Sequence, residues 1–463
     1  MKKLFCLCLC LTLALSLLAC GGGDTPTTTA AAPALQVGYS KVSIVPKKPL
    51  ALSSTDLPEY IAVYEDVYMT CVAITDAEDE TILLFTTDIS YCAKATRQSL
   101  LKEASKASGV PVENMFFSCT HNHSGLEPSG PATSVLKTAI GEASAAALAD
   151  RSAATLSIGS TRTEGMNFVR HYTTENGDWV GDNYYSADGA KAKTMEREAD
   201  PTMQLMRFDR PGKSPVLLVN WQAHANYSYK MEYLNADFIG SMRAKVENET
   251  GCLFAYFQGA AGNLNPVSKL GDNKFDHSLS GMTQYGQALA DYVIPALENM
   301  TAVSGEGLDI LHHTTTIQVR QDSSDVVIAA GAYALIRSNG GSHQEAVVAA
   351  NDLIHGDQGA EYVSLRSGKA GPQEAQISAI RLGDVAFVVA PYEMFDDSGI
   401  YIRENSPFDM TFILGYTNGR LGYMPTRACV EHGCYEYEGS MYEAGTAEFL
   451  AEEYISLLKQ LHP

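Results

Sequence analysis

The sequence is short of positive charge for its length. Lys and Arg together number 33 against 54 Asp and Glu, which gives a formal net charge of −21 at pH 7. A protein that binds nucleic acid needs a basic face to neutralise phosphates. The composition therefore argues against a nucleic-acid partner and says little about a small-molecule substrate.

Beyond residue 20 the sequence also lacks long apolar runs and closely paired cysteines. No later segment reaches the ~20 apolar residues of a transmembrane helix. Six cysteines follow Cys20, and none forms a Cys-x-x-Cys pair of the kind that holds zinc. Cys429 and Cys434 are near enough in sequence to form a disulfide. The other four lie in apolar runs, which favours buried thiols.

The one long apolar run is at the start of the chain, MKKLFCLCLCLTLALSLLAC. Two lysines precede roughly fifteen apolar residues, the length of a signal-peptide core. The sequence Leu17-Leu18-Ala19-Cys20 is similar to a bacterial lipobox, in which cleavage leaves a lipidated Cys20. We expect a signal peptide over 1–19, a flexible tether over 20–34 and a protein that is lipid-anchored on the extracytoplasmic face of a bacterial envelope. Ordinary secretion with a fortuitous cysteine is the alternative.

The remaining residues, 35–463, contain no internal repeat and no linker, and they can bury a large core as one domain or as two fused lobes. We expect one large domain. Runs rich in branched and aromatic residues predict strands at 36–45, 66–75, 81–90, 114–121, 215–224, 252–259, 384–393 and 410–418. Helical periodicity is present at 93–108, 135–149, 236–250, 282–297 and 446–461. This alternation is typical of an α/β fold with central mixed β-sheets flanked by helices.

Polar or metal-capable residues follow several of these strands. Open α/β sheets place their sites beyond strand ends. The residues at the predicted strand exits are His121, His224, the Ala260-Ala261-Gly262-Asn263 loop, Glu393 and Tyr423. We therefore expect a metal site at these strand ends.

The stretch FFSCTHNHSG, 116–125, carries two histidines one residue apart. On an extended segment His121 and His123 would point to one side, so that one ring could bind a metal while the other reaches a water. Two histidines that finish a strand and bond to backbone carbonyls are the alternative. Together with His224, Glu393 and a tyrosine, the donors are those that a catalytic Zn²⁺ accepts. Zn²⁺ lowers the pKa of water to roughly 7 and polarises carbonyls.

These segments resemble the neutral and alkaline non-lysosomal ceramidases, zinc amidases that cut the N-acyl bond of ceramide. The resemblance covers most of the chain after the tether. It rests on VGYSKVSIVP (37–46), THNHSG (120–125), NWQAHA (220–225), YFQGAAGNLNP (256–266), APYEMF (390–395) and TNGRLGYMPTR (417–427). The resemblance implies zinc held by His121, His224, Glu393 and Tyr423, with His123 as the proton-transferring residue.

The resemblance leaves several positions open. Tyr416 competes with Tyr423 for the role of ligand. Arg170, in GMNFVRHY, is similar to the family's arginine that contacts the substrate near the scissile amide, and an ion-paired or surface arginine is the alternative. Asp88 and Asp237 are candidates to orient the ligand histidines, with helix N-caps as the alternative.

The sequence also departs from the family. Asn263 and Asn265 stand where the family has an aspartate and a catalytic serine, so covalent catalysis through residue 265 is excluded. The amide of Asn265 can donate a hydrogen bond to a developing oxyanion. Leu126 and Glu127 change the turn after the histidines, and we expect no β-sandwich domain of the ceramidase kind within the 463 residues. Ceramide itself is therefore open to question as the substrate.

The hypothesis from the sequence is an exported zinc-dependent hydrolase of an N-acyl amide, ceramide-like or another lipid, that uses metal-activated water. The alternative is a non-catalytic, ligand-binding lipoprotein on the same fold, favoured by the two asparagines. A metal hydrolase of the amidohydrolase type is disfavoured. In amidohydrolases the histidine pair comes early in the chain and is followed by two further histidines and an aspartate at strand ends, whereas here the pair is at His121 and His123 and that later set is missing.

Overall fold

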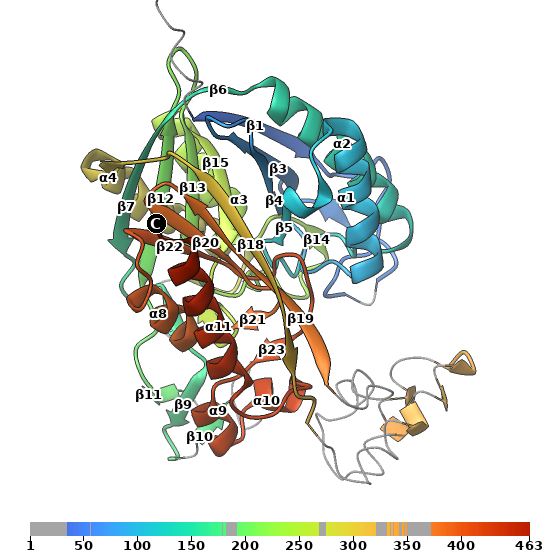
Figure 1. Cartoon of the computed structure of the whole chain (residues 1–463). Helices are drawn as coiled ribbons and strands as arrows, with labels where there is room; N and C mark the ends of the chain where they lie inside the picture. Colours follow the sequence, from blue (N-terminus) through green and yellow to red (C-terminus); the bar gives the residue numbers. More distant parts are fainter. Residues whose placement is uncertain are drawn as a thin grey trace, which may run out of the picture. The chain divides into compact units, whose positions relative to one another are not determined.

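Three strand–helix–strand units form the frame of the computed structural model (Figure 1). In each unit the helix returns the chain to the starting edge, so that the two strands pair in parallel. The first unit is β4 (Thr81–Thr87), α1 (Lys94–Ser108) and β5 (Met115–Cys119). The second is β13 (Val216–Trp221), α3 (Phe238–Thr250) and β15 (Leu253–Gln258). The third is β20 (Val385–Val389), α8 (Asp396–Glu404) and β22 (Met410–Leu414).

Antiparallel strands extend each parallel pair into a mixed sheet. The first sheet has the order β5-β4-β3-β1-β6, with β1 (Gln36–Ser43), β3 (Tyr68–Thr75) and β6 (Ser152–Ala153). The second has the order β15-β13-β12-β7-β17, with β7 (Thr155–Arg162), β12 (Thr202–Asp209) and β17 (Thr301–Val303). The third has the order β18-β19-β20-β22, with β18 (Leu308–Ile317) and β19 (Gln373–Leu382).

The three sheets share one apolar core between them. Leu84, Phe116, Leu218, Phe257 and Phe412 come from all three sheets and are almost completely buried there. The outer faces are covered by helices, because the paired strands are apolar on both faces. α1 and α2 (Gly130–Ala149) cover the first sheet, α3 and α4 (Leu279–Ala296) the second, and α8 and α11 (Thr446–Leu461) the third.

Short strands and helices surround the ends of these sheets. The strands are β2 (Ala62–Val63), β8 (Asn167–Val169), β9 (His171–Thr174), β10 (Trp179–Gly181), β11 (Ala192–Met195), β14 (Tyr233–Leu234), β16 (Leu264–Pro266), β21 (Glu393–Met394) and β23 (Tyr423–Met424). The helices are α9 (Arg427–His432) and α10 (Tyr435–Gly439).

The structure describes residues 35–463 except 56, 178, 182–191, 268–274, 321–330, 334, 337, 342–344, 347 and 350–371. The predicted signal peptide, the tether and Cys20 therefore lie outside the described residues. Among the helices of the described part, none is long and apolar enough to cross a membrane.

The structure confirms the mixed α/β fold and each strand and helix predicted from sequence, with α2 beginning earlier, at Gly130. Cys429 and Cys434, which are near enough in sequence to pair, form a disulfide. The four remaining thiols of the described chain, Cys71, Cys92, Cys119 and Cys252, are buried as expected.

Candidate metal centre

The three parallel strand pairs end at one place. His121 follows β5, His224 follows β13, Glu393 follows β20 and Tyr416 follows β22. Backbone hydrogen bonds tie these ends together, because the Cys119 amide donates to the carbonyl of Tyr416 at 3.3 Å and the Gly415 amide donates to the carbonyl of Gln258 at 2.9 Å. Residues far apart in sequence thus meet at the junction of the sheets.

Three donor atoms converge at this junction. Oε2 of Glu393 lies 3.6 Å from Nε2 of His121 and 3.4 Å from Nε2 of His224. Two ligands of a tetrahedral Zn²⁺ with bonds of ~2.0–2.1 Å are about 3.3 Å apart. The spacing of the three donors therefore fits a metal ion held among them.

Unsatisfied polar atoms at the junction also fit a cation. Nε2 of His224, Oε2 of Glu393 and the hydroxyl of Tyr416 are buried and have no hydrogen-bond partner among the described residues. A buried polar group without a partner costs about 1–3 kcal/mol. One ion bound at this point would satisfy the histidine nitrogen and the carboxylate oxygen together.

Backbone carbonyls set the orientation of the two histidine rings. Nδ1 of His121 lies 2.8 Å from the carbonyl of Ser90, and Nδ1 of His224 lies 2.8 Å from the carbonyl of Ala261. A proton on each Nδ1 leaves Nε2 with the lone pair that binds metals. Burial lowers the pKa of His121 well below its usual value and that of His224 to about 3, so both rings are neutral.

The two aspartates that were candidates to orient these histidines bind other groups. Asp88 instead accepts from the guanidinium of Arg243 at 2.8 and 2.9 Å. Asp237 caps α3 by accepting from the Phe238 amide at 2.9 Å, which was the alternative interpretation. The orienting groups are carbonyls of loop residues, which side-chain identity does not reveal.

His123 lies beside the donors. Its Nε2 is 3.2 Å from Nε2 of His121, and its ring is half-buried. The HxH segment does not continue as a regular strand, since His121 has φ of 59°, in the left-handed region. Non-glycine residues rarely adopt this conformation, and it costs of order 1–3 kcal/mol. The structure thus confirms that the two rings approach one another, although not through strand geometry.

Two tyrosines flank the donors, as the sequence left open. The ring of Tyr416 stacks on His121 with centroids 4.0 Å apart, and burial together with Glu393 raises the pKa of its hydroxyl well above the usual value. Tyr423 pairs with Glu393 between β21 and β23, and its ring lies 6.4 Å from that of His224. Both tyrosines therefore stay candidates for a further ligand.

Arg170 lies behind Tyr423 and is fully buried. Its Nε donates to Oε1 of Glu436 at 2.5 Å, and its Nη2 donates to the carbonyl of Gly262 at 2.6 Å. The guanidinium lies 5.4 Å from the centre of the Tyr423 ring. This ion pair matches the alternative interpretation from sequence, and a contact with substrate stays a prediction. Sequence reasoning missed Glu436, because no local pattern links it to residue 170.

The two asparagines of the loop after β15 have different partners. The Asn263 side chain donates to Oδ1 of Asp396 at 2.7 Å and accepts from the Asp396 amide at 3.0 Å. Asn265 accepts at Oδ1 from Nδ2 of Asn226 at 3.2 Å. Asn263 therefore joins the loop to α8, whereas Asn265 pairs with a residue close to His224 in the chain.

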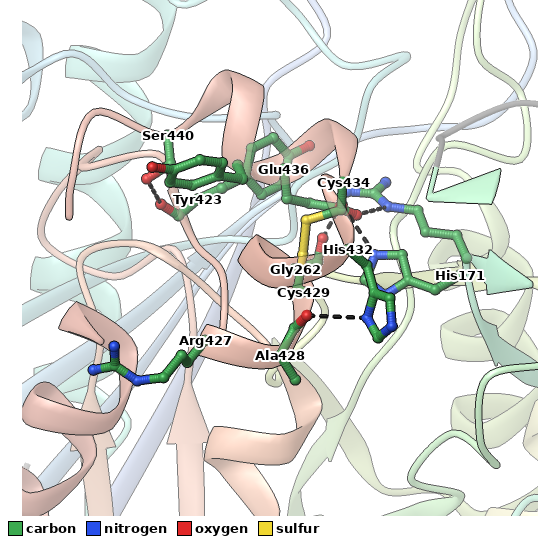
Figure 2. Close-up of a disulfide and its surroundings, with 12 residues drawn as sticks. His171, Gly262, Tyr423, Arg427, Ala428, Cys429, His432, Cys434, Glu436 and Ser440 are labelled. Atoms are coloured by element: carbon green, nitrogen blue, oxygen red, sulfur yellow. Dashed lines mark hydrogen bonds and ion pairs between the residues drawn. A yellow bond between two sulfur atoms is a disulfide. The ribbon is translucent and has the colours of Figure 1, made fainter. Parts of the chain in front are cut away.

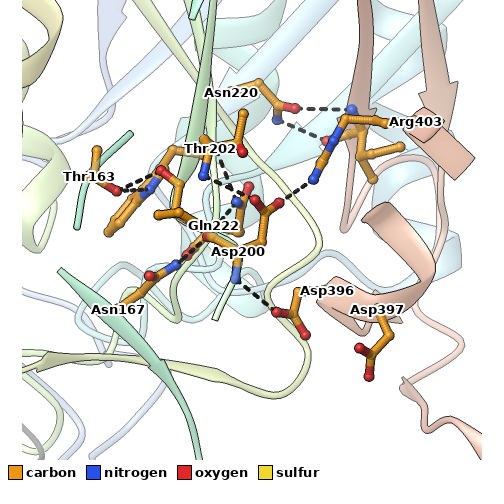
Figure 3. A network of polar contacts seen from close by, with 12 residues as sticks. Thr163, Asn167, Asp200, Thr202, Asn220, Gln222, Asp396, Asp397 and Arg403 are labelled. Atoms are coloured by element: carbon orange, nitrogen blue, oxygen red, sulfur yellow. Dashed lines mark hydrogen bonds and ion pairs between the residues drawn. The ribbon is translucent and has the colours of Figure 1, made fainter. Parts of the chain in front are cut away.

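A polar network holds the segment that leads to His224 (Figure 3). The Gln222 side chain donates to the carbonyls of Asp200 and Thr202 at 2.9 and 3.0 Å. The Asn167 side chain donates to the carbonyls of Asp200 and Gln222 at 3.0 and 2.8 Å. The Asp200 amide donates to Asp396 at the start of α8. These bonds fix the exit of β13 against the third sheet's helix.

Solved structures include close matches to this fold. No family model and no curated protein matches the sequence. A neutral ceramidase from Pseudomonas aeruginosa superposes with a TM-score of 0.69 at 17% identity, over 93% of this chain and 74% of the ceramidase. The chain has the neutral ceramidase fold. A second structure, described as a ceramidase complexed with C2, superposes with a TM-score of 0.70 at 16% identity, over 93% of this chain and 75% of the other. The neutral ceramidase-like fold expected from THNHSG and the later segments is confirmed.

Proposed function

We propose that the protein is a zinc-dependent hydrolase of N-acyl amides that acts on a ceramide-like or another lipid substrate. The observation that carries the proposal is the pair of buried, unsatisfied donors, Nε2 of His224 and Oε2 of Glu393, facing Nε2 of His121. The neutral ceramidase fold supports the choice of an amide bond.

His121, His224 and Glu393 would hold the ion, with Tyr416 or Tyr423 as a further ligand. Zn²⁺ supplies an acidified water and polarises the scissile carbonyl when it is bound. His123, whose Nε2 lies 3.2 Å from that of His121, would take a proton from water and return it to the leaving nitrogen.

Asn265 would stabilise charge on the carbonyl oxygen. Its Oδ1 accepts from Asn226, and its Nδ2 would donate to a developing oxyanion. The reaction then needs no hydroxyl nucleophile at residue 265 and gives a carboxylic acid and an amine. Arg170, paired with Glu436, would support the ring of Tyr423, whose centre lies 5.4 Å from the guanidinium.

We also propose that the protein is exported and anchored by lipid at Cys20, on the extracytoplasmic side of a bacterial envelope. The basic start, the apolar run and the Leu-Ala-Cys ending of the first twenty residues support this proposal. An anchor of this kind would hold the hydrolase close to lipid substrates.

A ligand-binding protein without turnover is the second candidate. The observation that favours it is that Asn265, in place of a serine, is occupied by a hydrogen bond to Asn226. Measuring both zinc content and substrate turnover distinguishes the hydrolase from the binding protein.

The test is the zinc content of the signal-free protein together with fatty-acid release from a panel of N-acyl amides and matched esters. We expect about one zinc per chain and metal-dependent release, with both lost in His121→Ala. The matched control is His313→Ala, because His313 lies on β18 and pairs with Glu453 at the surface. Zinc without release from any substrate would favour the binding protein, and a zinc-free wild type in zinc-supplemented medium would reject the metal site.

A further inference from the structure

A second group of metal-capable side chains surrounds the disulfide (Figure 2). Cys429 lies in α9, Cys434 precedes α10, Glu436 lies within α10, and His171 begins β9. All four are buried, and one donor atom from each lies within 4.8 Å of the others. Two sulfurs, one imidazole nitrogen and one carboxylate oxygen form a donor set suited to a closed zinc site.

Two of these donors already have the spacing of metal ligands. Nε2 of His171 lies 3.1 Å from Oε2 of Glu436, close to the separation of about 3.3 Å between two ligands of a tetrahedral Zn²⁺. In the oxidised protein this pair is joined by a hydrogen bond, and the two cysteines are joined by their own disulfide.

The outer partners of these donors are those that metal ligands need. Nδ1 of His171 lies 3.0 Å from Oε2 of Glu196, which is the carboxylate–histidine arrangement found behind zinc ligands. Oε1 of Glu436 accepts a hydrogen bond from Arg170. The other carboxylate oxygen, Oε2, therefore faces His171. Both ligands are therefore held in orientation without the metal.

We propose that reduction of the Cys429–Cys434 disulfide creates a second zinc site, formed by the two cysteine sulfurs, His171 and Glu436. A dithiol reductant supplies two electrons and two protons, the S–S bond breaks to give two thiols, and the reductant becomes a disulfide. Zn²⁺ then displaces the two thiol protons and the proton on Nε2 of His171 to solvent. A small-molecule disulfide oxidant reverses the change: it takes two electrons from the two cysteine thiolates and two protons from solvent to become a dithiol, the Cys429–Cys434 bond forms again and the ion is released.

The site has a route to solvent. A cavity of about 680 Å³ is lined by His171, Cys429 and Glu196, together with apolar side chains that include Phe395 and Phe449. Phe449 is 43% exposed, so the cavity is open at the surface. The cavity therefore gives a reductant and an ion a path up to Cys429 and His171, whose side chains are almost completely buried in its wall.

The second site shares Glu436 with Arg170, which in turn contacts the loop carbonyl of Gly262 beside the first donor set. Reduction of the disulfide and binding of zinc by Glu436 would therefore change the position of Arg170. The proposal does not rest on the proposed hydrolase, because the four donors are distinct from His121, His224 and Glu393.

The experiment uses the full signal-free chain carrying His121→Ala, in which the first donor set is disabled. We measure zinc after incubation with Zn²⁺ and desalting, in the oxidised protein and in protein reduced with dithiothreitol. We expect no zinc when oxidised and about one per chain when reduced. Co²⁺ in place of Zn²⁺ should give a thiolate-to-cobalt charge-transfer absorption only in the reduced protein.

Three variants in the same background assign the site. Cys429→Ser combined with Cys434→Ser should abolish the redox-dependent zinc, whereas Cys252→Ser, at a buried thiol elsewhere, should retain it. Glu196→Gln should weaken zinc binding by the reduced protein about 10–100-fold. Equal zinc in both redox states, or retention of redox-dependent zinc by the double serine variant, overturns the proposal. Zinc in wild type that does not increase on reduction overturns it as well, whatever the outcome for the hydrolase.

Discussion

Glu436 neutralises two buried cations, and removing its charge should destabilise the fold strongly. Its carboxylate and the guanidinium of Arg170 are both completely buried, with 2.5 Å between Oε1 and Nε, and its Oε2 lies 3.1 Å from His171. Although burial opposes its ionisation, Arg170 and His171 hold the pKa of Glu436 at about 2. The carboxylate is therefore charged at any working pH, and Glu436→Gln leaves buried positive charge without a partner.

Breaking one side of a buried ion pair costs about 3–5 kcal/mol. We expect Glu436→Gln to lower the free energy of unfolding by that amount, measured by urea denaturation of the oxidised protein at pH 7. Glu196→Gln is the matched control, because Glu196 contacts the same histidine but is 28% exposed, and it should cost at most about 1 kcal/mol. The double variant Arg170→Met with Glu436→Leu should recover much of the loss, since it removes both charges of that pair and leaves His171 its other partner, Glu196. Equal, small losses in the two glutamine variants would refute this account of the pair.

Further predictions concern the metal ligands, the pH dependence and the loop at residue 262. The zinc Kd of Tyr416→Phe and of Tyr423→Phe can be measured by competition with a chelator, and the variant that removes a ligand should raise it at least about tenfold. Equal Kd values for both variants and wild type would exclude a tyrosine ligand. Burial opposes protonation of His171, but Glu436 and Glu196 raise its pKa to about 9, so its stabilising contribution is complete below about pH 6.5 and is lost as the pH rises through 9. Urea titrations at pH 6 and 9.5 should show a fall of up to about 3 kcal/mol that His171→Gln removes, and an unchanged fall in that variant would contradict the assignment. A Cβ on Gly262 would lie 2.6 Å from the carbonyl oxygen of Glu393, so Gly262→Ala should displace this ligand and weaken zinc binding, whereas Gly141→Ala, with its nearest neighbour at 3.7 Å, should leave zinc binding unchanged.

Sequence patterns found the paired strands because those strands are apolar on both faces. In β4, Leu84 packs into the core between the sheets and Phe85 packs toward the helices, so the run reads as continuous hydrophobicity. The antiparallel strands β7, β12, β18 and β19 were missed. β18, LDILHHTTTI, is at the edge of its sheet and is largely accessible, so polar residues interrupt its pattern.

The donor residues could be identified from sequence because each belongs to a recognisable segment at a strand exit. The contacts that orient them could not, since the carbonyls of Ser90 and Ala261 are set by loop conformation. The pairing of Arg170 with Glu436 was also beyond the sequence. It joins two segments that are far apart in the chain and carries no periodicity, so only the folded structure brings it to light.

The convergence of three sheets on one donor set also constrains the order of events during synthesis. His121 and His224 are made well before Glu393, and the three atoms approach each other only when the last strand–helix–strand unit docks on the other two. A chain arrested before that unit would have histidines but no carboxylate, and its affinity for zinc would be correspondingly low. Tight zinc binding would then occur only after the final third of the protein has folded, and incomplete chains would not bind the ion tightly.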